Sequence, residues 1–360
     1  MTIKFNPKRL SLARKRRRKT GKALASEAAL SAVTVSRLEN GDNEPDEATV
    51  ARLAKALEYP VAFFFGDDPE ELDETTVSFR SLSKMSAMER EASKSAGALG
   101  LQLSGWIEQM FSLPDADLTD LSYETDPEIA AKALRSEWSL GEQPIPNMLG
   151  LLEVHGVRVF SLAENTASVD AFSFWWNERP FVFLNNFKTA EHSVYDSAHE
   201  LAHLVMHRHA GPQPSRSAER EANQFASAFL MPKNDVLSRM PRFITVDTII
   251  KAKARWRVSA MALAYRLHSL GLLTEWQYKS ACIELGRRGY RTGEPNGIER
   301  ETSAVWKKVL SMLWNERMTK NEIAASLSLP MDELENLIWG LAGPVLQTER
   351  NESKSRLRLV

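Results

Sequence analysis

Short amphipathic stretches separated by turn residues dominate the first third of the chain. Apolar residues recur at helical spacing within residues 7–65, and this pattern predicts a group of short helices. We expect these helices at residues 9–20, 21–29, 32–40 and 46–59. The acidic run DDPEELDE follows and is typical of a solvated linker. Helical spacing then resumes over residues 79–112.

The pattern changes near residue 128 to a mixture of helical and β-rich stretches. Three runs, VRVFSL, DAFSFWW and PFVFLNN, predict a small antiparallel sheet. They cover residues 157–162, 170–176 and 180–186. We expect helices at residues 126–138, 145–156, 190–209 and 217–230, and further helices within 245–289. This part of the chain is therefore predicted to mix α and β structure.

A faint internal repeat relates the two ends of the chain. Six positions of the first segment recur in the last one at a constant offset. They are Thr20, Leu24, Ala25, Leu30, Val35 and Leu38, which map onto Thr319, Ile323, Ala324, Leu329, Leu334 and Leu337. Both segments could fold as the same small helical unit, although any two amphipathic helix pairs share such spacing.

Length and composition place the chain among ordinary soluble proteins. Its 360 residues exceed what one core holds, so two or three domains are expected. No apolar run approaches the roughly 18 residues of a membrane-spanning helix, so no membrane partner is expected. The single cysteine, Cys282, rules out an internal disulfide framework and favours a reducing compartment. We therefore expect a cytoplasmic protein.

Positive charge is concentrated in the first forty residues. They hold eleven Lys and Arg residues against two acids, whereas the whole chain has a net charge of −1. Such asymmetry predicts a polyanion partner for this basic head alone.

Histidines are concentrated as well, around the sequence HELAH, which has the form HExxH. Residues four apart lie on one face of a helix, so His199 and His203 can point both imidazoles at one cation. Glu200 is rotated by about 100° from His199. It can instead reach a water at the metal, where a general base for hydrolysis belongs. Apolar neighbours indicate a buried face, on which unpaired imidazoles would be costly.

Two histidines need a third protein ligand to hold zinc. His207 lies about 12 Å along a continuous helix from the first histidine, so these two cannot share an ion. We expect His207 and His209 at the C-terminal end of the helix, in structural or outer roles. Glu219, on the next helix, is the predicted third ligand, and Glu221 is its rival. Asn223 shares a face with Glu219 and could hold a ligand histidine through its other ring nitrogen.

The sequences AHELAHLVMH and EREANQFASAFLMP resemble the ImmA/IrrE family of bacterial zinc metallopeptidases, over about residues 128–290. The resemblance implies that His199, His203 and Glu219 bind Zn²⁺ and that Glu200 is the catalytic base. Ala202 stands where the family usually has glycine. Members of the family cut a repressor or antitoxin, often on a stress signal, and some fused members act chiefly as ligand-sensing regulators.

If the domain is a peptidase, Glu200 and the strand at residues 180–186 each have a predicted role. Glu200 would take a proton from a water held at the metal and pass it to the leaving amine. The strand at residues 180–186 would be an edge strand that pairs with an extended substrate. Simple filling of the sheet is the alternative for that strand.

The sequence KTGKALASEAALSAVTVSRLENG resembles the helix-turn-helix of the XRE (Cro/phage-repressor) family. In that geometry the second helix, about 32–39, lies in the major groove of double-stranded DNA. Basic and polar residues of the head are the predicted DNA contacts. They are Arg14, Lys15, Arg18, Lys22, Ser31, Val33, Thr34 and Arg37. Ala32 and Val33 stand where the family often has polar readers, and Gly21 replaces a frequent glutamine. We therefore expect phosphate contacts to dominate the affinity.

The tail copy of this helix carries acids, Asp332, Glu333 and Glu335. These would repel phosphate, so the tail unit is predicted to be structural or to contact protein.

Together these features predict a mainly α protein with a small antiparallel sheet (α+β) in four parts. They are a helix-turn-helix domain at 1–66, an acidic linker with connecting helices at 67–127, a metallopeptidase domain at 128–295 and a C-terminal, degenerate helix-turn-helix-like unit at 296–360. The predicted function is a transcriptional regulator that binds an operator as a homodimer. It would cleave a repressor, an antitoxin or itself in a stress or phage-related response. The alternative is a non-proteolytic regulator or antitoxin whose zinc fold senses a ligand or a partner.

Overall fold

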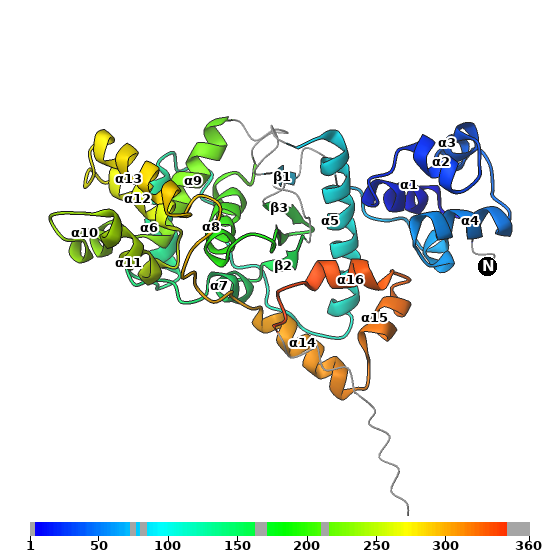
Figure 1. The fold of residues 1–360 in the computed structure, drawn as a ribbon. Coiled ribbons are helices and arrows are strands. Elements are labelled where there is room, and N and C mark those ends of the chain that lie inside the picture. The colour runs from blue at the N-terminus through cyan, green and yellow to red at the C-terminus, as the bar shows by residue number, and fades with distance from the viewer. Residues whose placement is uncertain (1–3, 73–76, 80–84, 163–170, 210–215, 344–360) are drawn as a thin grey trace, which may run out of the picture.

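The computed structural model describes residues 4–72, 77–79, 85–162, 171–209 and 216–343. Within these ranges the chain is mainly helical and carries one small sheet, which confirms the predicted fold class. A helical head (residues 4–66), a body built around the sheet and a helical tail (residues 304–343) follow one another along the chain (Figure 1). No helix in the described ranges has both the length and the apolar character to cross a membrane.

The head consists of four α-helices and a short 3-10 helix. They are α1 (Pro7–Arg16), α2 (Gly21–Glu27), α3 (Ala32–Asn40), α4 (Glu47–Leu57) and η1 (Val61–Phe65). Each α-helix starts at a residue whose side chain accepts a backbone N–H of the first turn, namely Asn6, Thr20, Ser31 and Asp46. Four apolar positions of the internal repeat lie on α2 and α3 and are buried, namely Leu24, Ala25, Val35 and Leu38.

The body contains the sheet and its covering helices. Its strands are β1 (Val77–Phe79), β2 (Arg158–Ser161), β3 (Ala171–Trp176) and β4 (Arg179–Leu184). The helices before β2 are α5 (Ala87–Glu108), α6 (Pro127–Glu137) and α7 (Met148–Val154), and the next group follows β4. Those after it are α8 (Ala190–Met206), α9 (Arg216–Leu230), α10 (Lys233–Arg239), α11 (Val246–Trp256), α12 (Ala260–Ser269) and α13 (Glu275–Arg287).

The sheet differs from the prediction in three respects. The strand order is β1-β3-β4-β2, with β2 parallel to β4 and the other pairs antiparallel. The sheet is therefore mixed, because the β3–β4 hairpin inserts β4 beside β2 in the same direction. For the same reason β4 is a central strand, and the prediction that residues 180–186 form an edge strand was wrong. β1 is a strand that the sequence pattern did not predict.

Two helices enclose the sheet, one on each face (Figure 1). Strand β3 alternates, so Phe172 and Phe174 face α5 whereas Ser173 faces α8. Gly97 and Gly100 of α5 allow this close approach, because a Cβ at Gly100 would overlap the ring of Phe183. The sheet thus serves as a rigid platform beneath α8.

The tail consists of α14 (Ala304–Asn315), α15 (Lys320–Ser326) and α16 (Met331–Ile338). The apolar positions of the internal repeat are buried in the tail copy and, apart from the half-buried Leu30, in the head copy. In the tail these are Ile323, Ala324, Leu329, Leu334 and Leu337. Thr319 caps α15 as Thr20 caps α2. The two ends of the chain therefore use the same residue pattern for the same helix pair.

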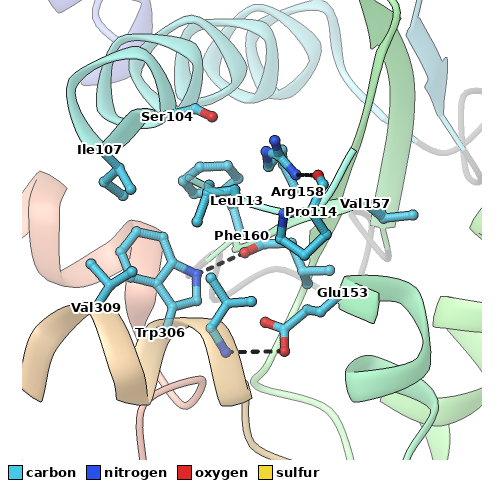
Figure 2. Close-up of a pocket in the computed structure, with 12 residues that line it drawn as sticks. Ser104, Ile107, Leu113, Pro114, Glu153, Val157, Arg158, Phe160, Trp306 and Val309 are labelled. Atoms are coloured by element: carbon cyan, nitrogen blue, oxygen red, sulfur yellow. Dashed lines mark hydrogen bonds between the residues drawn. The ribbon is translucent and has the colours of Figure 1, made fainter. Parts of the chain in front are cut away.

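A small, mostly apolar cavity marks the place where the tail meets the sheet, between α5, β2 and α14 (Figure 2). Trp306 of α14 donates its indole N–H to the carbonyl oxygen of Val159 at 2.9 Å. Glu153 accepts the backbone N–H groups of Ala304 and Val305 at 2.9 and 3.3 Å, which caps α14. These contacts anchor the tail to the body.

Candidate metal centre and nucleic-acid interface

Two helices bring a cluster of possible metal ligands together. His199 and His203 lie one turn apart on α8, and Glu219 lies in the first turn of α9. The two Nε2 atoms are 3.1 Å apart, and the carboxylate oxygens of Glu219 lie 3.6 Å from His199 Nε2 and 3.3 Å from His203 Nε2. Ligand atoms at a tetrahedral zinc with bonds near 2.1 Å lie about 3.4 Å from one another. The cluster therefore has the spacing of three ligands on one ion.

The chemistry of this cluster also fits a divalent cation. Nitrogen and carboxylate oxygen are both zinc ligands. The Oε1 atom of Glu219 is buried and lies 3.3 Å from Nε2 of His203, and burying a carboxylate is costly unless a positive charge is nearby. Burial raises the pKa of Glu219, but the hydrogen bonds from His199 and His203 outweigh it and lower the pKa to about 2. The carboxylate is thus ionised at neutral pH, as a ligand must be.

The members of the cluster differ in exposure. His199 is 0% exposed and His203 is 4% exposed, whereas the side chain of Glu219 is 25% exposed. Glu219 is therefore the member of the cluster most accessible to solvent.

Glu200 lies beside the cluster and contacts the sheet. It is fully buried, and its Oε2 accepts the hydroxyl of Ser173 at 2.6 Å. The sequence analysis did not identify Ser173. The signal for it is a lone serine among apolar residues on the face of β3 that looks toward α8. Strand β1 pairs with β3 at this same point, with Ser78 opposite Ser173.

A second layer of polar contacts surrounds His203. Its Nδ1 lies 3.0 Å from Nδ1 of His207, and Nε2 of His207 lies 3.1 Å from Oε2 of Glu221. Burial lowers the pKa of His207, and so does the neighbouring His203. Glu221, the rival third ligand, is thus used by His207 and does not join the cluster.

In the structure Asn223 contacts its own helix. Its amide Nδ2 donates to the backbone carbonyl of Glu219 at 2.7 Å, not to a histidine ring. Because that carbonyl lies one turn earlier on α9, the amide bonds back to its own helix. His209 lies beyond α8, where it contacts Asp120 at 2.8 Å.

In the head, helix α3 presents its N-terminal half to solvent. Lys22, Ser31, Val33 and Arg37 are exposed, and Thr34 is half-buried. Ser31 caps α3 and also contacts the hydroxyl of Thr34 at 2.8 Å. These five predicted DNA contacts belong to α2, α3 or the residue that caps α3.

The basic run of α1 and the following turn behaves differently, because acids of other elements pair with it. Arg14 binds Glu39 of α3 through two bonds of 2.6 and 2.9 Å, and Lys15 pairs with Glu91 of α5 at 2.7 Å. Two of the predicted DNA contacts, Arg14 and Lys15, are therefore paired with acids of the protein itself, although the side chain of Lys15 stays 40% exposed. Arg18, a third, is half-buried in the turn after α1.

The next two arginines of the run join the head to the tail. Glu333 of α16 is 2% exposed and accepts Nε of Arg16 at 2.7 Å and the hydroxyl of Tyr59 at 3.1 Å. Arg17 donates to both carboxylate oxygens of Asp332, at 2.5 and 3.2 Å. Burial, and then the nearby Glu333, raises the pKa of Tyr59 well above its usual value. The acidic tail helix thus contacts the basic head, as its charge suggested it would contact protein.

The acidic linker is also paired with the head. Lys8 lies 3.0 Å from both Asp68 and Glu71, and Arg9 donates to the carbonyl of Asp67 at 2.7 Å. The first part of the linker thus pairs with α1, while the side chains of Asp68 and Glu71 stay 65% and 71% exposed, as expected of a solvated linker.

Comparison with known protein families gives two matches, one on each functional part. Residues 10–64 match the family described as helix-turn-helix. Residues 152–268 match the peptidase family described as the IrrE N-terminal-like domain. The matches confirm the predicted fusion of an XRE-type helix-turn-helix with an ImmA/IrrE-type, metallopeptidase-like domain. A search of curated proteins found no match.

Proposed function

We propose that this protein is a DNA-binding regulator whose body is a zinc peptidase. Its substrate would be a protein, such as a repressor, an antitoxin or the chain itself. The observation that supports this most is the convergence of two imidazoles and one carboxylate from two helices, with Glu200 buried beside them.

The residues divide the work as follows. His199, His203 and Glu219 hold Zn²⁺, which when bound activates a water and polarises a scissile carbonyl. Glu200 accepts the proton of the attacking water and delivers it to the leaving amine. The hydroxyl of Ser173 occupies one carboxylate oxygen of Glu200, so it fixes the orientation of this base.

The head supplies the place where this activity is used. Lys22, Ser31, Val33, Thr34 and Arg37 contact an operator in double-stranded DNA. A helix-turn-helix reads paired half-sites as a dimer, so a homodimer is proposed.

Glu200→Gln tests the peptidase, because the amide keeps the shape of the side chain and cannot act as a base. Zinc-loaded protein is incubated with candidate repressors and antitoxins encoded beside its gene. We expect cleavage by the wild type and none by Glu200→Gln, with equal zinc content in both. If the wild type and Glu200→Gln give the same products, Glu200 is not the base and the proposal is wrong.

A second candidate function is a regulator without proteolysis, in which the body senses a ligand or a partner. The contacts of α16 with both the head and the body favour it, because Arg16 binds Glu333 and Asn186, just after β4, donates to the carbonyl of Trp339 at 2.9 Å. This function predicts that zinc changes operator binding in a gel-shift assay equally for the wild type and Glu200→Gln.

A further inference from the structure

We propose that His207 and Glu221 form a relay that orients His203 as a metal ligand. The inference rests on the proposed zinc site and names two positioning residues for it. Three contacts carry it: His203 to His207 at 3.0 Å, His207 to Glu221 at 3.1 Å, and the placement of His203 Nε2 toward the cluster.

The positions of the protons follow from the geometry. Nε2 of His203 faces His199 and Glu219. In the zinc-bound state this nitrogen is the ligand, so it carries no proton. A neutral imidazole has one N–H, which must then be on Nδ1. That N–H donates to Nδ1 of His207, which accepts only if the proton of His207 is on Nε2. The Nε2–H in turn donates to Glu221 Oε2. Each donor in the chain therefore has one acceptor, and only one arrangement of protons satisfies all of them.

The backbone explains why His207 can reach back to His203. His207 follows the last residue of α8, and its N–H still bonds to the carbonyl of His203 at 3.1 Å. Its φ of −118° departs from helical geometry, and the ring of His207 lies 5.0 Å from that of His203. The side chain is 11% exposed, so little water competes for the contact.

The relay also ties together the two helices that supply the ligands. Glu221 lies two residues after Glu219, so α9 provides both a ligand and the end of the relay. A carboxylate that orients a ligand histidine raises the basicity of the ring and holds its tautomer. Here the effect passes through a second histidine.

Zinc affinity of the full-length protein, measured by competition with a chelating dye, tests the relay. We expect His207→Leu to weaken zinc binding about 10–100-fold, the usual cost of losing an outer partner. His207→Asn should restore most of the affinity, because the amide oxygen can accept from Nδ1 of His203. Glu221→Leu should weaken binding more than Glu221→Gln, which keeps an acceptor. His209→Leu is the matched control, since His209 is exposed and contacts Asp120 instead.

Nitrogen NMR of the histidine rings gives a readout that a merely structural role would not change. In zinc-loaded wild type the proton of His203 should be on Nδ1, and its exchange with solvent should be faster in His207→Leu. Equal zinc affinity of His207→Leu and His209→Leu would overturn the relay while leaving the zinc site intact. Failure of the wild type itself to bind zinc would instead remove the proposed function and the relay with it.

Discussion

The histidines of α8 and the basic residues of α1 are two runs of chemically similar residues. Their side chains are arranged in opposite ways in the structure. His199, His203 and His207 approach one another along one face of a helix. In contrast, the cations of α1 diverge, and most are paired with acids of other elements. A run of chemically similar residues is therefore a site only where the backbone directs its side chains to one place.

The largest expected effect is on zinc affinity and comes from removing one of the histidines of α8. His203→Ala removes one ligand and should lower zinc affinity roughly 100- to 1,000-fold, since structural zinc sites gain about 10–16 kcal/mol from about four ligands. Metal content after gel filtration and dye competition measure it. Retention of stoichiometric zinc by His203→Ala would show that the histidines do not form the site.

A fall of one pH unit in acid should weaken zinc binding by the next largest factor. The pKa of Glu219 is lowered to about 2, so this carboxylate stays ionised through the range from pH 7 to 4. The histidine rings must be neutral to bind zinc, and protons compete with the metal as the pH falls. With two histidine ligands the affinity should fall by up to about 100-fold per pH unit in acid. A pH series of dye competition checks the slope, and a third proton in that slope would mean that Glu219 also titrates there.

Among the basic residues of α1, Arg16 forms a buried pair with Glu333 of α16, and this pair should contribute to the stability of the protein. Glu333→Gln keeps the shape but removes the charge that balances Arg16, and should lower the free energy of unfolding by about 1.5–3 kcal/mol. Glu335→Gln is the matched control, because Glu335 pairs with Lys320 on the surface and should change stability by less than about 0.5 kcal/mol. Urea unfolding measures both, and equal effects would argue against a structural junction.

The smallest effect distinguishes exposed from paired cations in DNA binding. Arg37→Ala should reduce the salt dependence of binding to a DNA duplex by about one counterion. Lys15→Ala should leave this slope nearly unchanged, because Lys15 pairs with Glu91. Fluorescence anisotropy at several salt concentrations gives the slopes. A larger effect for Lys15 than for Arg37 would place DNA on α1 instead of α3.

The sequence predicts the structure best where a single helix determines the geometry. The spacing of His199 and His203, and the apolar positions of α2 and α3, follow from the helical repeat alone. Glu219 needed the assumption of a second helix packed on the first, and the structure has that helix. The internal repeat was also informative, because its apolar positions are buried in both copies except Leu30, which is half-buried.

Contacts between distant elements could not be predicted in this way. Arg16 and Glu333 are separated by 317 positions in the chain, so no local pattern relates them. Ser173 reaches Glu200 only because β3 lies on α8, and the hairpin that makes β4 central is a property of the whole sheet. Asn223 has the right face for its predicted role, but the carbonyl of Glu219 is a nearer acceptor.

Strand β1 affects how any peptide could approach Glu200. The backbone N–H and C=O groups on the outer side of β3 at residues 172–174 are already bonded to residues 77–79. Each such row accommodates one neighbour, so an incoming polypeptide could extend the sheet there only by exchanging places with three residues of the same chain. Because residues 77–79 are covalently attached, their effective concentration at β3 is high and does not depend on the concentration of the incoming polypeptide.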